Sequence, residues 1–175
     1  MLSRKAKYGL KAVLSLAADP RTQPAVVAEL ARREAIPRKF LEQILLELKH
    51  RGLLQSRRGK GGGYQLTRPA DHLSIGEIIR ALDGPIAPTP CVSQTAYVKC
   101  DECVDEELCG IRLVMKEVHA ATTRILDSTT VADVIRSVEA ARAVRVATPG
   151  GMAGRGSALR RAERAVPFPQ TRRKA

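Results

Sequence analysis

The stretch LLQSRRGKGGGYQLT, residues 53–67, indicates the architecture more clearly than any other part of the chain. Residues 53–58 and 64–67 are typical of two short strands, and the glycine-rich segment 59–63 predicts a hairpin turn between them. Glycines let a backbone come close to a phosphate, and the neighbouring arginines supply positive charge. A nucleotide-binding loop is excluded, because Lys60 is followed by glycine and a strand instead of Ser or Thr and a helix. We therefore predict the basic wing of a winged helix. Its expected DNA contacts are Arg57, Arg58, Gly59, Lys60, Gly61 and Tyr64.

Two short helices are predicted just before this hairpin. They cover residues 25–34 and 38–50, and the break at residues 35–37 separates them, as in a helix-turn-helix. In the second helix, leucines and an isoleucine recur at the i, i+3, i+4 and i+7 positions of a buried face. Its outward N-terminal end could enter the major groove. Many helical pairs share this pattern without touching DNA, so it favours DNA binding chiefly together with the wing. The expected contacts are Arg38, Lys39, Glu42 and Gln43.

The remaining elements predict a mainly α-helical fold with a small β-hairpin, that is, a winged helix-turn-helix followed by a long dimerisation helix. Further helices are expected at residues 3–18, 74–83, 105–127 and 129–138. Glycine, proline and arginine then dominate without periodicity, which is typical of a disordered segment. The expected division is a DNA-binding domain at 1–84, a cysteine-rich cluster-binding loop at 85–109, the dimerisation and final helices at 105–138, and a basic tail at 139–175.

The helix at 105–127 carries apolar residues spaced alternately three and four apart, which is the pattern of a heptad seam. A seam in so small a domain is typical of packing against the same helix of a second copy in a homodimer. Packing within one chain is the alternative. The seam residues are Leu108, Ile111, Met115, Val118, Thr122 and Ile125.

The net charge of +12 is unevenly distributed along the chain. Residues 1–68 carry 15 Lys/Arg against 5 Asp/Glu, residues 69–140 carry 6 against 12, and residues 141–175 carry 9 against 1. A basic front predicts a polyanionic partner, although a generally basic proteome could also explain it. Aromatic residues make up 3% and Trp is absent, which argues against single-strand binding by base stacking. Double-stranded DNA is the expected partner.

Neither an enzyme nor a membrane protein is expected. The sequence contains no recognisable Ser/His/Asp set, phosphate loop or paired catalytic carboxylates. The first residues superficially resemble a signal peptide, but Lys11 interrupts the apolar run and leaves it too short. No later run approaches the roughly 20 apolar residues that a membrane span needs. The expected location is the cytoplasm.

All four cysteines lie in CVSQTAYVKCDECVDEELC, residues 91–109. Two disulfides in a chain of this kind would suit a small secreted domain, so thiolates that bind a soft metal are favoured. The spacing C-x(8)-C-x(2)-C-x(5)-C suits an iron–sulfur cluster and a closed tetrahedral zinc site about equally. The candidate metal ligands are Cys91, Cys100, Cys103 and Cys109.

Several motifs together carry a family resemblance. They are Lys7-Tyr8-Gly9-Leu10, Leu41-Glu42-Gln43, Arg58-Gly59-Lys60-Gly61-Gly62-Gly63-Tyr64, Ser74-Ile75-Gly76-Glu77-Ile78-Ile79, and the cysteine loop running into Cys109-Gly110-Ile111-Arg112. Over roughly residues 1–137 the chain resembles the bacterial winged-helix family that contains IscR, NsrR and RirA. The resemblance implies a homodimer on a pseudo-palindromic DNA site, a cluster at the N-terminal end of the long helix, and DNA contacts at Glu42, Gln43 and Arg58.

The cysteines depart from the family pattern. The gap from Cys103 to Cys109 matches the second gap of the family, whereas the gap from Cys91 to Cys103 is longer and contains the extra Cys100. The fourth ligand of relatives is a histidine or an aspartate at positions that here hold Arg112 and Lys7. His119 lies too far along the helix and is expected at the surface or on the seam. Cys100 is therefore the candidate fourth ligand.

We expect a sequence-specific DNA-binding transcriptional regulator, most simply a repressor. Its DNA affinity would be controlled by a 4Fe–4S or 2Fe–2S cluster, which the resemblance favours over zinc. The alternative is a zinc-stapled or thiol-switched winged-helix protein without an iron–sulfur cluster.

Overall fold

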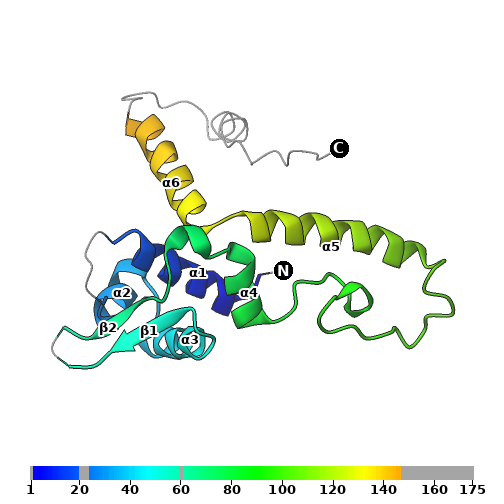
Figure 1. Ribbon diagram of the computed structural model, residues 1–175, viewed down its shortest axis with the longest axis horizontal. Coiled ribbons are helices and arrows are strands. Elements are labelled where there is room, and N and C mark those ends of the chain that lie inside the picture. Colours follow the sequence, from blue (N-terminus) through cyan, green and yellow to red (C-terminus); the bar gives the residue numbers. More distant parts are fainter. Residues whose placement is uncertain (1, 20–23, 60, 147–175) are drawn as a thin grey trace. The chain divides into compact units, whose positions relative to one another are not determined.

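A computed structural model describes residues 2–19, 24–59 and 61–146 of the chain. The chain divides after Asp133 into two compact units, and the DNA-binding surface and the cysteine loop discussed below lie in the first. The elements are α1 (Arg4–Ala17), α2 (Val27–Glu34), α3 (Arg38–His50), β1 (Leu54–Arg57), β2 (Gly63–Leu66), η1 (Ala70–His72), α4 (Ile75–Asp83), η2 (Pro90–Val92), α5 (Gly110–Ser128) and α6 (Val131–Val146). The prediction of a mainly helical chain with one antiparallel hairpin is confirmed (Figure 1).

The helix-turn-helix forms because a left-handed residue ends α2 sharply. Ala35 has φ 53°, and the N–H of Ile36 donates to the carbonyl oxygen of Ala31 at 3.0 Å. This is a Schellman-type stop, and it lets Pro37 lead directly into α3. The expected inward residues of α3 are fully buried: Leu41, Ile44, Leu45 and Leu48. They pack α3 against α1, α2 and α4, so the opposite side of α3 faces outward.

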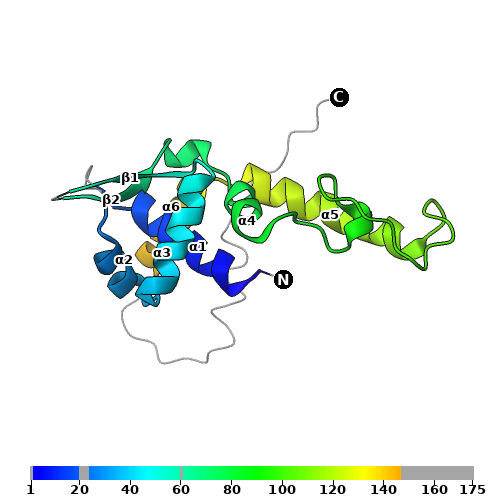
Figure 2. The same cartoon turned by 90° about the horizontal axis from the view of Figure 1, so that it is seen from below.

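The wing has the predicted antiparallel pairing, with Leu54 opposite Leu66 and Arg57 opposite Gly63. Its turn is closed by the N–H of Gly62, which donates to the carbonyl oxygen of Gly59 at 2.8 Å. Figure 2 shows the hairpin reaching away from the helices. The hairpin is therefore built as a short strand pair with a glycine turn, as the sequence predicts.

An isolated β-bridge, which the sequence did not reveal, ties the wing to the helical core. Ala25 and Tyr64 exchange backbone hydrogen bonds of 2.9 and 3.0 Å, just before α2 begins. Gly63 makes this approach possible, because a Cβ there would collide with the carbonyl group of Ala25. The wing is thereby held to α2, which precedes the recognition helix.

Two helix boundaries differ from the prediction by more than two residues. The long helix begins at Gly110 and not near residue 105, because the Asp105 side chain accepts from the N–H groups of Glu107 and Leu108 at 2.8 and 3.2 Å. An aspartate that captures nearby backbone N–H groups favours a turn over a helix. At the other end, α6 continues to Val146, beyond the expected end at 138, since residues 139–146 are good helix formers without Gly or Pro. The expected tail therefore cannot begin at 139, and its residues 147–175 lie outside the described part of the chain.

Candidate DNA-binding surface and cysteine loop

The outward face of α3 gathers the predicted base-contacting residues. Arg38, Lys39 and Gln43 are exposed, and Glu42 is half-buried. The Arg38 Nε donates to Glu42 Oε1 at 2.8 Å, so these two side chains are paired one turn apart. This face can present two cations, a carboxylate and an amide to a groove. Sequence reasoning missed one neighbour, Leu46, which is exposed on the same face.

The wing presents its basic tip to solvent. Arg57, Arg58, Gly59 and Gly61 are exposed, whereas Lys60 lies outside the described residues. Tyr64 is half-buried and its backbone is engaged by Ala25, so this residue supports the wing from behind its tip.

The cysteine loop begins on the short helix η2, which packs against α5. Cys91 is buried there, Cys103 and Cys109 are half-buried, and Cys100 is exposed. Cys109 is the N-cap residue of α5, so it adjoins the free N–H groups of the first helical turn. All four thiols are free.

The thiols influence one another electrostatically. The pKa of Cys100 is raised mainly by the charge of Cys91, then by desolvation and by a hydrogen bond with Cys91. The pKa of Cys103 is raised mainly by desolvation and then by the charge of Cys109. Four thiolates so placed repel one another, and a bound cation would relieve that repulsion.

The donor set suits an iron–sulfur cluster or zinc chemically, since both are held by cysteine thiolates. Its arrangement does not yet form a closed site. Within residues 2–19, 24–59 and 61–146, no three His, Cys, Asp or Glu side chains stand together as a group that could hold a metal ion. A bound group would therefore require the loop to draw its sulfur atoms together.

Arg112 joins the two ends of the loop to α5. Its Nε donates to the carbonyl oxygen of Cys91 at 3.3 Å, and its Nη1 donates to the carbonyl oxygen of Glu106 at 3.5 Å. The guanidinium also lies 3.8 Å from the Glu106 carboxylate. The residue in the histidine position of relatives thus serves here as a clamp, which agrees with its exclusion as a ligand.

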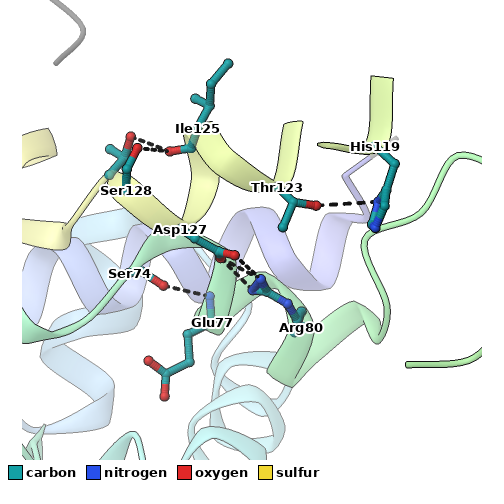
Figure 3. A network of polar contacts seen from close by, with 9 residues as sticks. Ser74, Glu77, Arg80, His119, Thr123, Ile125, Asp127 and Ser128 are labelled. Atoms are coloured by element: carbon teal, nitrogen blue, oxygen red, sulfur yellow. Dashed lines mark hydrogen bonds and ion pairs between the residues drawn. The ribbon is translucent and has the colours of Figure 1, made fainter. Parts of the chain in front are cut away.

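The opposite end of α5 is fastened to α4. Figure 3 shows Asp127 facing Arg80, with hydrogen bonds of 2.8 and 2.5 Å to Oδ1 and 2.6 Å to Oδ2. The carboxylate lies over Gly76, where a Cβ would clash with it. Beside the pair, the N–H of Ile75 donates to the carbonyl oxygen of Thr129 at 2.9 Å. Helix α5 is therefore fixed to the DNA-binding part of the chain at this end.

Most of the predicted seam is uncovered within the single chain. Ile111, Val118, Thr122 and Ile125 are exposed on α5. Two seam residues are placed differently: Leu108 precedes the helix, and Met115 is half-buried. Val114, which was not predicted, is exposed at the helical spacing that completes the row. We call Ile111, Val114, Val118, Ala121 and Ile125 the α5 stripe.

His119 lies on a different side of α5 from the one expected. It is buried, its Nδ1 is 3.4 Å from the hydroxyl oxygen of Thr123 (Figure 3), and its Nε2 has no hydrogen-bond partner among the described residues. On α5, His119 faces inward, whereas the adjacent Val118 of the α5 stripe is exposed. His119 is thus neither on the seam nor at the surface.

A membrane span is not found among the described helices, none of which is both long and apolar enough to cross a bilayer.

Comparisons with known proteins agree with this architecture. Residues 2–137 match the model of the Rrf2 family, described as an iron-dependent transcriptional regulator. An rrf2-like HTH-type transcriptional regulator of Rhodobacter capsulatus is 44% identical over 138 residues, which cover 77% of this chain and 92% of that protein.

Two solved structures are also similar. CymR, the global cysteine regulator of B. subtilis, has a TM-score of 0.65 and 31% identity, covering 78% of this chain and 96% of its own. IscR of T. potens has a TM-score of 0.64 and 29% identity, covering 86% and 93%. The winged helix, the exposed recognition face and these similarities together show a DNA-binding transcriptional regulator and not an enzyme. The chain belongs to the Rrf2 family.

Proposed function

We propose that this regulator is a homodimer whose affinity for a pseudo-palindromic DNA site is controlled by an iron–sulfur cluster. The ligands would be Cys91, Cys100, Cys103 and Cys109. The observation that carries the proposal is that four free cysteines lie on one loop, which packs against α5 at η2 and ends at Cys109, the N-cap residue of α5. The iron-dependent description of the family and the similarity to an IscR support iron–sulfur over zinc. When bound, the cluster would supply sensitivity to iron supply or oxidants.

The connections of α5 support a route from the loop to DNA. Arg112 attaches the loop to the start of α5, and Asp127 attaches the end of α5 to Arg80 of α4. A rearrangement of the loop would therefore shift α5. The cluster would change DNA affinity to the extent that it binds the two arrangements of the loop and α5 with different free energies.

In this proposal, residues 1–84 bind DNA, the loop at 85–109 senses, and the α5 stripe pairs two copies. The two recognition helices then meet successive major grooves of a pseudo-palindrome. We propose repression in the cytoplasm as the direction of control, which in vitro transcription from a bound promoter would test.

The deciding experiment begins with protein purified without oxygen. Visible absorption from a sulfide-bridged iron centre, with iron matched by acid-labile sulfide, is the expected result. Removing the cluster with an oxidant should then change DNA affinity, and Cys100→Ala should lower the iron content. Ser93→Ala is the control, because this buried neighbour of Cys91 is not a ligand. Protein that contains zinc alone, or loaded and cluster-free forms that bind DNA equally, would refute cluster control.

A thiol switch is the second candidate, and the influence of Cys91 on the neighbouring Cys100 thiol, whose pKa it raises mainly through its charge, favours it. Two thiols this close could form a disulfide when a peroxide accepts two electrons and two protons and is reduced to water. Mass spectrometry of peroxide-treated, metal-free protein would then find a Cys91–Cys100 cross-link together with altered DNA affinity. Cluster control predicts that peroxide bleaches the cluster-loaded protein and that protein that never held iron does not respond, whereas the thiol switch requires a response in protein that never held iron.

A further inference from the structure

The recognition helix carries one large apolar side chain that its core does not use. Leu46 keeps 45% of its surface exposed, whereas the four inward residues of α3 keep none. Those four pack α3 into the core of the winged helix. Leu46 is therefore only partly covered by the fold.

Leu46 lies within the outward face of α3 that gathers the predicted base-contacting residues, and not at the margin of that face. It follows Glu42 and Gln43 by four and three residues and Lys39 by seven, which are spacings that share one side of a helix. Lys49 and His50 continue the same side and are also exposed. An apolar side chain is thus surrounded by residues suited to phosphates and base edges.

The major groove offers such a side chain a specific partner. Hydrogen-bond donors and acceptors line the groove, and its apolar feature is the C5 methyl group of thymine. A leucine pressed against a donor or acceptor would leave that group unpaired, whereas a thymine methyl group would be buried favourably. Isolated exposed leucines are common on protein surfaces, so the distinction requires a test that isolates the methyl group.

We propose that Leu46 is a specificity-determining residue that contacts a thymine methyl group in each half-site. The inference depends on DNA binding by α3 and not on the cluster. It adds an apolar contact to the polar and charged contacts of Glu42, Gln43, Arg38 and Lys39.

Deoxyuridine provides the test, because it differs from thymidine only by that methyl group. Duplexes selected from a random pool by the full-length chain, prepared without oxygen, would be resynthesised with one thymidine replaced at a time. The wild-type protein should lose about fourfold in affinity at one position of each half-site, roughly the effect of one buried methyl group. Leu46→Ala should bind thymidine and deoxyuridine duplexes equally at that position.

Leu113→Ala is the matched control, since Leu113 is exposed on α5, away from the recognition helix. It should keep the wild-type difference between the two bases. The proposal is overturned if no position distinguishes the bases for the wild type, if Leu46→Ala retains the difference, or if the selection enriches no sequence. Equal weakening of all duplexes by Leu46→Ala, with an unchanged melting temperature, would instead indicate a contact with the DNA backbone and would also overturn it.

Discussion

At the scale of single residues, Gly63 is where an added methyl group would be most disruptive. Its Cβ would lie 2.5 Å from the carbonyl carbon of Ala25, and backbone atoms cannot move aside as a side-chain end can. Gly63→Ala should break the pairing of Ala25 with Tyr64 and lower the free energy of unfolding by about 2 kcal/mol. Urea denaturation would measure this change.

Gly110→Ala is the control for that substitution. Nothing lies within 4 Å of a Cβ at Gly110, and alanine is the better helix former at the first position of α5. Its stability should be unchanged or slightly raised. If Gly63→Ala were as stable as Gly110→Ala, the close approach of the wing to Ala25 would not exist in solution.

At Ala35 the expected effect is the reverse of that at Gly63, because removing the methyl group should stabilise the chain. Ala35 is exposed and holds a left-handed conformation with φ 53°. Ala35→Gly removes that strain without removing a packed group, although glycine also gains entropy when unfolded. We expect a net stabilisation of about 0.5–1 kcal/mol in thermal or urea unfolding. A loss of stability would mean that the turn between α2 and α3 is not left-handed.

At the scale of elements, the sequence predicted those parts whose signal is local. The wing follows from its glycines, and α3 from four buried residues at helical spacing. The β-bridge at Ala25 was missed because a single bridging residue gains its structure only from Tyr64, far along the chain. Val114 was missed because the facing of α5 depends on contacts with α4 and η2, which periodicity alone does not give.

The candidate site was predicted unevenly for the same reason. The exposed cations of α3 and the wing could be named from the sequence, since a basic helix-turn-helix pattern is local. The clamp formed by Arg112 could not be predicted, because it joins Cys91 to a residue on another element through a main-chain carbonyl group. Neither composition nor residue spacing indicates such a contact between a side chain and a distant main-chain group.

Substitutions in the wing and in the recognition helix should affect the salt dependence of DNA affinity differently. Arg57 is exposed beside the glycine turn, a position suited to a phosphate. Arg57→Gln should therefore weaken all duplexes alike and reduce the slope of log affinity against log salt by about 1. Gln43→Ala should instead relax the sequence preference and leave that slope nearly unchanged. Fluorescence anisotropy at several salt concentrations would measure both, and identical slopes for Arg57→Gln and wild type would exclude a phosphate contact.

The contribution of the Arg80–Asp127 ion pair to the contact between α4 and α5 can be tested with a double-mutant cycle. Both side chains are partly exposed, so solvent screens their attraction. Alanine at each position, singly and together, should reveal a coupling energy of about 0.5–1 kcal/mol in urea denaturation, decreasing in high salt. Lys5 and Glu47, paired at 3.2 Å between α1 and α3, offer a comparison that does not involve α5. Strictly additive effects at Arg80 and Asp127 would show that the pair does not stabilise that contact.

At the scale of the whole molecule, the α5 stripe is a row of apolar side chains that are mostly exposed in the single chain. Ile111 and Val118 are 70% and 44% exposed, and they belong to one continuous row along a helix of 19 residues. A row spaced alternately three and four apart fits the same row of a second copy related by a two-fold axis. Such pairing would bury on each copy what neither can bury alone.

Val118→Glu should therefore convert the proposed dimer into a monomer. It would place two carboxylates against each other in a desolvated seam, where an unpaired buried charge costs several kcal/mol. Light scattering after gel filtration would give the mass, and affinity for a two-half-site duplex should fall far more than affinity for a single half-site. Leu113→Glu is the matched control, because it adds the same charge at an exposed leucine of α5 outside the stripe. If Val118→Glu kept the wild-type mass, or if both variants dissociated equally, the stripe would not be the dimer interface.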